Sequence, residues 1–317
     1  MATDANTTGN LPLATSQRSS RCAPHRAHTR RQAGSDAGTT GQTDGYPHLR
    51  QAVADLPDAP GVYLFHGQPG DLPLYIGKSI HLRSRVLAHL RAPDEARMLQ
   101  QTRRIEHIRT AGELGALLLE SALIKQQQPL YNRKLRRNRQ LCAWQVVPGS
   151  PLRLQLAAAQ TVNFATTPQL YGLFASRHAA TEALQALADR HGLCLSVLGL
   201  EKGVPGKACF RHMVKRCAGA CCGQTSRAAH DARTLAALTD MQLVCWPFAG
   251  AVALLEVCPL DPQFVQYHVV RNWCYLGSAP NLAQARQLDA VAAGFDADGY
   301  KIVCKPILHQ QTPIIEL

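Results

Sequence analysis

The chain has 317 residues, a formal net charge of +12 and a pI near 9.4, and its length allows two modest domains, each with its own core. Its apolar runs are shorter than the roughly eighteen residues that span a bilayer, and its first residues lack the apolar core of a secretory signal. We therefore expect a cytoplasmic protein without membrane spans, whose basic charge suits an anionic partner.

Residues 1–45 form a polar tail of Thr, Ser, Gly, Ala, Gln and Arg, with almost no bulky apolar residue after Leu13. Such a composition cannot bury enough surface to offset chain entropy, so we expect disorder. A DNA-gripping arm and an organellar transit peptide are the alternatives, and three aspartates count against the second. Five arginines against these aspartates leave only +2, so the rest of the chain carries +10.

Residues 61–65 (GVYLF) and 74–77 (LYIG) are two runs of β-branched and aromatic residues on either side of a Gly/Pro/Asp-rich turn, a pattern that predicts a β-hairpin. A strand is also expected at 103–109. The predicted helices are 46–56, 79–90, 94–101 and 112–128. Together these elements predict an α+β domain over residues 46–147, with a small three-stranded antiparallel sheet flanked by helices.

A Pro-Gly-Ser-Pro run at residues 148–151 indicates a domain boundary. The remaining residues, 148–317, predict a mixed α+β region with a cysteine cluster. Helices are expected at 179–191 and 227–242, and extended segments at 151–165, 250–257, 266–276 and 300–307.

Glu120 is a lone carboxylate among the apolar positions of its predicted helix. A carboxylate in such surroundings is costly unless a cation compensates it. One carboxylate and several waters suit Mg²⁺, and the waters leave room for a substrate phosphate. The alternative is a glutamate paired with a nearby arginine at the edge of the core.

Tyr63 and Tyr75 fall on adjacent predicted strands, so their rings can lie close together. A phenol is a poor base at neutral pH unless a neighbouring cation lowers its pKa, and Lys78 is placed to do so. Plain core packing is the alternative for both tyrosines. Arg85 and His89 stand four apart on the polar face of the 79–90 helix, where the planar guanidinium of Arg85 suits a phosphate.

Five landmarks in order resemble the GIY-YIG nuclease domain: GVY, LYIGKS, an Arg eight positions after Gly77, a Glu in LLLESALIK and an Asn closing PLYN. Within that superfamily, LPDAPGVYLF and ESALIKQQQPLYN are similar to the UvrC group of repair excinucleases. The chain length and RRNRQLCAWQ resemble the short members of the group. The resemblance runs from about Leu56 to the C-terminus.

The resemblance implies Tyr75 as general base, assisted by Lys78, with Tyr63 orienting the site and Glu120 holding Mg²⁺ or Mn²⁺. His89 stands where the UvrC group usually has a tyrosine, so its role as base or leaving-group acid stays open. Asn132 is expected to position the helix of Glu120 by hydrogen bonding.

A run of basic residues without acids follows the predicted site and is expected to contact DNA phosphates without reading bases. A solvated charged loop is the alternative. The run comprises Lys125, Arg133, Lys134, Arg136, Arg137 and Arg139.

Eleven cysteines in a cytosolic chain favour metal ligands over disulfides. Cys209, Cys217 and Cys221 have the spacing C-x7-C-x3-C, with Cys194 upstream and Cys222 adjacent. Four thiolates suit zinc or an iron–sulfur cluster. This block resembles one associated with a [4Fe–4S] cluster in the UvrC group, with Cys194 as the expected fourth ligand and Cys222 as a substitute.

These features predict a Mg²⁺-dependent, structure-directed DNA endonuclease, and its one active site implies one incision. The resemblance implies that the incision lies on the 3′ side of bulky damage and belongs to nucleotide excision repair. The resemblance implies damaged double-stranded DNA and UvrB, loaded by UvrA, as partners. One rival is a non-catalytic DNA-binding or scaffold protein on the same fold. Another is a metal-sensing regulator centred on the cysteines, which leaves the nuclease residues unexplained.

Overall fold

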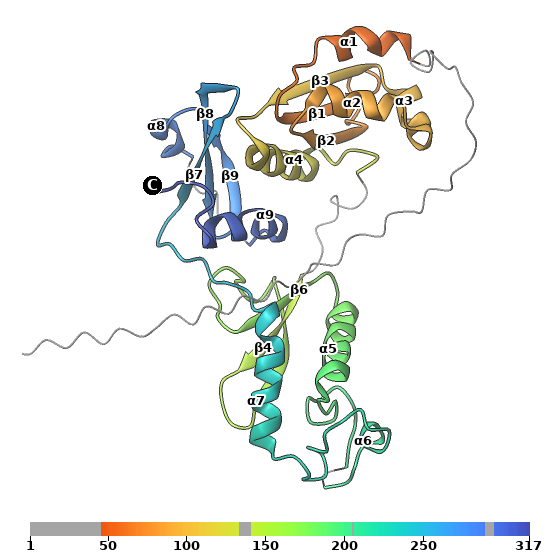
Figure 1. Cartoon of the computed structure of the whole chain (residues 1–317), viewed down its shortest axis with the longest axis vertical. Coiled ribbons are helices and arrows are strands. Elements are labelled where there is room, and N and C mark those ends of the chain that lie inside the picture. The colour runs from red at the N-terminus through yellow and green to blue at the C-terminus, as the bar shows by residue number, and fades with distance from the viewer. Residues whose placement is uncertain (1–45, 133–140, 205, 289–294) are drawn as a thin grey trace, which may run out of the picture. The chain divides into compact units, whose positions relative to one another are not determined.

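The computed structural model describes residues 46–132, 141–204, 206–288 and 295–317. Within these ranges the strands form three antiparallel sheets (Figure 1). Among the described residues, no helix combines the length and the apolar character that crossing a membrane requires.

The first sheet contains β1 (Gly61–His66), β2 (Tyr75–Ser79) and β3 (Arg104–Arg109) in the order β2-β1-β3. The predicted hairpin is confirmed, and β2 is an edge strand. Side chains of β1 alternate between two faces, because successive residues of a strand point in opposite directions. Tyr63 and Phe65 pack in one core cluster, and Val62 and Leu64 pack in another.

Helices cover both faces of this sheet, which confirms the α+β fold. The helix α4 (Glu113–Gln127) packs against Val62 and Leu64 through Ile124. The other face contacts shorter helices that contribute leucine, valine and methionine side chains. These are η1 (Pro47–Leu49), α1 (Arg50–Ala54), α2 (Leu82–Leu90) and α3 (Ala96–Gln101). The short helix η2 (Pro93–Glu95) lies between α2 and α3 in the chain.

The second sheet contains β4 (Cys142–Val147), β5 (Arg153–Ala158) and β6 (Leu170–Phe174) in the order β5-β4-β6. We predicted a domain boundary after residue 147, but β4 pairs with two strands that follow it and so belongs to the second sheet. Helices α5 (Arg177–His191) and α7 (Arg227–Leu238) pack with this sheet in one core (Figure 1). The short helices α6 (Phe210–Met213) and η3 (Thr239–Met241) complete this part.

The third sheet has the order β10-β7-β8-β9. Its strands are β7 (Val252–Cys258), β8 (Asp261–Arg271), β9 (Cys274–Ala279) and β10 (Ile314–Glu316). Two helices, α8 (Leu282–Ala285) and α9 (Ala297–Leu308), follow β9. The predicted C-terminal region therefore contains two separate sheets.

The prediction of a strand at residues 300–307 was wrong, because this segment lies within α9. Buried positions recur every fourth residue at Gly299, Val303 and Ile307, which is the spacing of one helical face. Asp296 caps the helix by accepting a hydrogen bond from the backbone N–H of Asp298. The buried face of this helix therefore decided the structure of the segment that was predicted as a strand.

The single strand predicted at residues 266–276 is a hairpin. Asn272 and Trp273 both have positive φ, 53° and 64°, and reverse the chain between β8 and β9. Two such residues match the tight turns that join antiparallel strands. Trp273 is fully buried and donates from its indole N–H to the Val244 carbonyl, so tertiary packing holds a turn that its residue type disfavours.

Candidate active site

Tyr63 is buried in β1, directly opposite Gly77 of β2. A Cβ atom at position 77 would lie closer than 3.0 Å to the Tyr63 hydroxyl group and to the Tyr75 ring, a separation that real side chains do not show. The glycine of LYIG is therefore required because it leaves space for two phenol side chains at the edge of the sheet.

A chain of hydrogen bonds begins at the Tyr63 hydroxyl. This hydroxyl lies 2.6 Å from Nε2 of His89, and Nδ1 of His89 contacts a carboxylate oxygen of Glu95. A neutral imidazole that donates Nδ1–H to Glu95 leaves Nε2 free to accept a hydrogen bond from the Tyr63 hydroxyl. Burial raises the pKa of Tyr63 and lowers the pKa of His89, so both groups are favoured in their neutral forms.

His89 was expected on the polar face of its helix, beside Arg85, but only 3% of its surface is exposed. Its ring packs with Tyr63, Phe65 and Tyr75, with centroid distances of 5.3 to 5.5 Å. Both ring nitrogens already have partners, so His89 acts on Tyr63 in this structure. Sequence reasoning missed Glu95, which lies beyond the helix end, where no helical spacing relates it to His89.

Tyr75 is half-buried and is the more accessible of the two phenols. Its ring centroid lies 6.2 Å from that of Tyr63, as expected for the two strands. Burial raises the pKa of Tyr75, the negative charge of Glu120 raises it further, and the guanidinium of Arg85 lowers it. The phenol, the guanidinium and the carboxylate therefore interact electrostatically across one small region.

Lys78 was expected to lower the pKa of Tyr75, but its ammonium lies 2.6 Å from a carboxylate oxygen of Glu113. Arg85 is the cation that lowers the pKa of Tyr75 and also that of Tyr63. Arg85 is exposed, so a substrate phosphate can reach its guanidinium. Lys78 contributes differently, since its charge and its backbone lower the pKa of Glu120.

Glu120 is half-buried on α4, as its apolar neighbours predicted. Burial raises the pKa of its carboxyl group, and Lys78 and Arg85 offset part of that increase. Across the described part of the chain, its carboxylate forms no ion pair shorter than 4.0 Å. The alternative of a glutamate paired with a nearby arginine is therefore not found, and the oxygens can hold a hard cation.

Asn132 forms two hydrogen bonds with the backbone of Ile76 in β2. Its side-chain oxygen accepts from the Ile76 N–H at 2.9 Å, and its amide donates to the Ile76 carbonyl at 2.7 Å. These bonds fasten the chain that leaves α4 to the strand between Tyr75 and Gly77. Asn132 thus lies where a positioning residue was predicted, although the element it contacts is β2.

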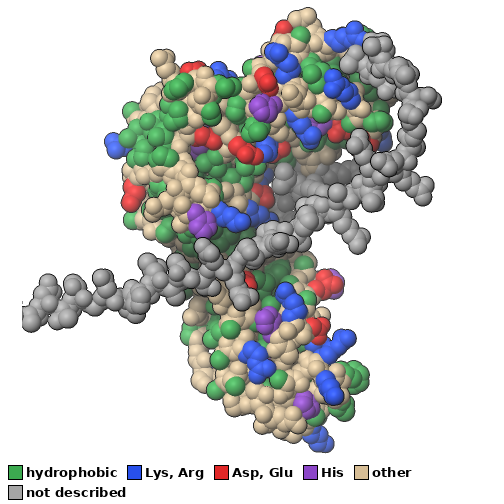
Figure 2. Space-filling model, in the orientation of Figure 1, with side chains coloured by type: hydrophobic (Ala, Val, Ile, Leu, Met, Phe, Trp, Pro, Cys, Tyr) green, Lys and Arg blue, Asp and Glu red, His purple; other side chains and the backbone are tan. Residues whose placement is uncertain are grey.

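Lys125 lies on α4 and pairs with Asp296 at 2.5 Å and with Asp298 at 3.2 Å. Its charge is compensated by carboxylates, so its contact with DNA stays a prediction. On the face shown in Figure 2, basic and acidic side chains are interspersed. The rest of the predicted basic run, Arg133, Lys134, Arg136, Arg137 and Arg139, lies outside the described residues.

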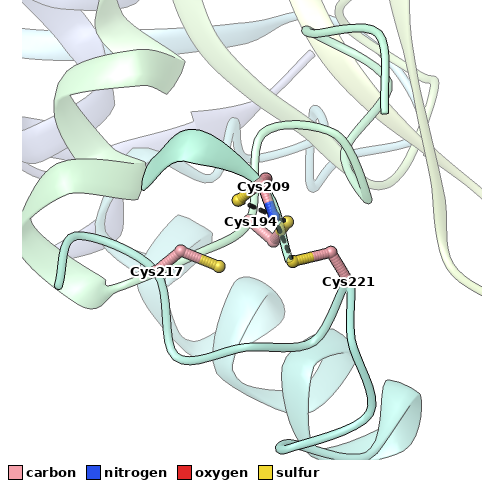
Figure 3. Close-up of side chains that lie close together, drawn as sticks. All are labelled: Cys194, Cys209, Cys217 and Cys221. Carbon is pink, nitrogen blue, oxygen red and sulfur yellow. Dashed lines mark hydrogen bonds between the residues drawn. The ribbon is translucent and has the colours of Figure 1, made fainter. Parts of the chain in front are cut away.

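The four predicted cysteine ligands are separated in the sequence but lie close together in the fold. The sulfur atoms of Cys194, Cys209, Cys217 and Cys221 all lie within 4.8 Å of one another and point inward (Figure 3). Cys194 follows the end of α5, and Cys209 precedes α6. The predicted substitute, Cys222, instead donates its S–H to the Gly219 carbonyl.

The electrostatics of this cluster differ from one thiol to the next. Burial raises the pKa of Cys217 to about 12, whereas for Cys221 the hydrogen bonds from the Cys209 backbone and the neighbouring thiols outweigh burial and lower its pKa to about 7. Four inward-facing thiols can hold a metal, because a bound cation stabilises them as thiolates.

Comparison with known proteins finds matches over most of the described chain. Three family models match in order: the UvrC-like GIY-YIG domain over residues 59–133, the UvrC/Cho excinuclease middle domain over 141–240 and the excinuclease Cho C-terminal domain over 251–317. These spans coincide with the three sheets.

Excinuclease Cho of Salmonella typhi is 54% identical over 273 residues, which cover 86% of this chain and 91% of the relative. Excinuclease Cho of Escherichia coli K12 is 55% identical, with 86% and 90% covered. UvrABC system protein C of Carboxydothermus hydrogenoformans is 29% identical over 186 residues, 56% of this chain and 30% of its own.

A crystal structure of the GIY-YIG N-terminal endonuclease domain of UvrC from Thermotoga maritima, bound to magnesium, shares 31% identity. The match covers 27% of this chain and 97% of the crystallised chain, with a TM-score of 0.25. The relatives that match most of the chain, together with the three family models in order, establish that this protein belongs to the Cho excinucleases of the UvrC family and is a DNA endonuclease.

Proposed function

We propose that this endonuclease hydrolyses one phosphodiester bond, on the 3′ side of a bulky lesion, in nucleotide excision repair. The observation that carries the proposal is the meeting of a half-buried phenol, an exposed guanidinium and a half-buried carboxylate at Tyr75, Arg85 and Glu120, the last without an ion pair shorter than 4.0 Å among the described residues. A non-catalytic scaffold has no need for these three groups in mutual electrostatic contact. One such site supports one incision for each binding event.

Each side chain of the site has a separate task. Arg85 binds the scissile phosphate through parallel N–H bonds, a geometry that suits its planar fork. Tyr75 accepts a proton from the attacking water, and it is the phenol that remains accessible. Tyr63, held by His89, fixes the position of Arg85, and Lys78 supports Glu120.

Glu120 fits a Mg²⁺ or Mn²⁺ ion, because a lone carboxylate whose pKa is raised by burial gains most from a nearby hard cation. The ion would supply positive charge that stabilises the phosphoryl transition state and offsets the effect of Glu120 on Tyr75. The protein's own contribution is to hold the carboxylate, the phenol and the guanidinium in fixed positions around the substrate.

Damage recognition is proposed to depend on a loader. The basic charge of residues 46–317 attracts DNA of any sequence, and this attraction weakens steeply as the salt concentration rises. Lesion recognition, in contrast, must distinguish distorted from regular duplex. The relation to the UvrC family supports UvrB, delivered by UvrA, as the partner that brings damaged DNA to the site.

The test is incision of a duplex with one bulky adduct and a different end label on each strand. We expect the protein alone to bind damaged and undamaged duplexes about equally and to nick both poorly at near-physiological salt. UvrA, UvrB and ATP should switch on one Mg²⁺-dependent cut, 3′ of the lesion on the damaged strand. Efficient cutting at one site by the protein alone would contradict the loader, and cuts on both sides would contradict single incision.

The cysteine cluster is proposed to hold a [4Fe–4S] cluster, and zinc is the alternative. Four thiolates suit either group, so the metal content decides between them. Protein purified without oxygen should be brown and contain about four irons per chain. Cys217→Ser should lose the colour and the iron, and Cys222→Ser, the matched control, should keep both. One zinc per chain with no visible absorbance would replace the iron assignment with a structural zinc site.

A further inference from the structure

Four polar side chains form a row on one face of the third sheet. Glu256 of β7 is the register partner of Gln266 of β8, and His268, two residues further along β8, is the partner of Ser278 in β9. Residues two apart on a strand share a face, so the row spans three strands. Nε2 of His268 lies 2.9 Å from a carboxylate oxygen of Glu256, and Nδ1 lies 2.7 Å from the Ser278 hydroxyl.

This row contacts the start of α4, the helix that carries Glu120. The two carboxylate oxygens of Glu256 accept hydrogen bonds from the backbone N–H groups of Leu114 and Gly115, both at 2.9 Å. The side-chain oxygen of Gln266 accepts from the N–H of Ala111 at 2.7 Å. The C-terminal sheet therefore satisfies two donors of the first turn of α4 and one donor just before its N-cap.

The helix cannot satisfy these donors by itself. The first N–H groups of any helix lack partners within it, and the residue at the N-cap normally supplies one through its side chain. Here the N-cap is Gly112, which has no side chain to do so. The carboxylate of Glu256 takes over that task, and its negative charge also interacts favourably with the helix dipole.

Two glycines shape the helix start for this contact. A Cβ at Gly112 would lie closer than 3.0 Å to the carboxylate of Glu256, and a Cβ at Gly115 would approach the His268 ring equally closely. Gly112 has φ of −163°, so its backbone conformation does not require glycine. Glycine is required because the carboxylate of Glu256 occupies the space that a Cβ would take.

The carboxylate is held in its charged form. His268 is fully buried, and only 17% of the Glu256 side chain is exposed. Burial raises the pKa of Glu256, but hydrogen bonds from His268 and from the backbone of α4 outweigh it and lower the pKa below its usual value. A charged acceptor makes stronger hydrogen bonds to backbone N–H groups than a neutral one.

We infer that Glu256 is a positioning residue of the nuclease, which caps α4 from the C-terminal domain and so fixes Glu120. Glu120 lies six residues after Leu114, about 9 Å along the helix axis. Glu113 of the same turn pairs with Lys78, which also lowers the pKa of Glu120. The C-terminal domain is therefore part of the machinery that orders the active site.

The test compares Glu256→Ala with Glu316→Ala in the full-length protein. Glu316 is an exposed glutamate on β10 of the same sheet and serves as the matched control. Glu256→Ala should accelerate amide hydrogen exchange in residues 113–120, measured without metal or DNA. It should lower the rate of cleavage by about 10–100-fold, as loss of a supporting residue does, with DNA affinity unchanged. Glu316→Ala should change neither exchange nor rate.

A double-mutant cycle separates capping from general loss of stability. Gly112→Ala should slow cleavage about tenfold in the wild-type chain, because its methyl group displaces Glu256. In the Glu256→Ala chain that clash is absent, so the same change should cost less than about threefold. Equal costs in both backgrounds would overturn the proposed capping.

Two further results would also overturn it. One is amide hydrogen exchange in residues 113–120 of Glu256→Ala that does not differ from wild type, whatever the cleavage rate of this variant. The other is an increase in exchange spread evenly over the chain, because that marks global destabilisation. The inference rests on the proposed role of Glu120, but the exchange measurement involves neither metal nor substrate. It can therefore succeed even if the metal assignment to Glu120 fails.

Discussion

Glu120→Ala should lower single-strand incision by at least about 10³-fold, because no other carboxylate is proposed to hold the catalytic cation. DNA binding should stay within about threefold of wild type, since the substitution removes no phosphate contact. Incision is measured with the end-labelled adduct duplex in the presence of UvrA, UvrB and ATP, and binding is measured separately without Mg²⁺. Calorimetric titration with Mn²⁺ should show the loss of one site.

Glu182→Ala is the matched control for this variant, since Glu182 is an exposed glutamate of α5. It should incise DNA like the wild type. Incision by Glu120→Ala that returns to near-normal rates at saturating Mg²⁺ would overturn the assignment of Glu120 as the metal ligand.

Tyr75→Phe should lower the incision rate by about 10²–10⁴-fold, the loss expected when a general base is removed. The substitution keeps the ring that packs against Tyr63 and His89, so the thermal midpoint should not change. Tyr131→Phe is the control, because Tyr131 packs against the same core and its hydroxyl contacts only Gln101 in the described structure. Tyr131→Phe should cut at the wild-type rate.

A loss below tenfold in Tyr75→Phe would transfer the role of base to the pair of Tyr63 and His89. Both of these side chains are buried, so in that case Tyr63→Phe should show the larger loss. The two phenylalanine variants assayed side by side therefore decide which phenol takes the proton.

Local sequence determined the architecture of the nuclease domain. A hairpin requires only two short strands and a turn, and its register places Tyr63 opposite Gly77. The helix of Glu120 is similarly local, since its apolar positions and the proline after it define its length. Because these features depend on neighbours within a few residues, Tyr75, Arg85 and Glu120 could be proposed as site residues from the chain alone.

Contacts between distant segments decided the rest. The burial of His89 depends on the ring of Tyr63, and its partner Glu95 belongs to the turn beyond the helix. The segment of α9 that was predicted as a strand is a helix, and its Val303 and Ile307 pack into the core of the third sheet. Periodicity within one segment cannot show which face another segment will cover.

The cap on α4 shows the same limit most clearly. The sequence determines that Gly112 and Gly115 begin a helix without a capping side chain. Taken by itself, this feature indicates only a less stable helix start. More than 140 residues separate Leu114 from Glu256, so only the folded chain could show that a strand of the C-terminal sheet supplies the missing acceptor. The sequence by itself determined which residues we propose for the chemistry, and the tertiary structure decided what holds them, because hydrogen-bond partners in a core are chosen by proximity in space.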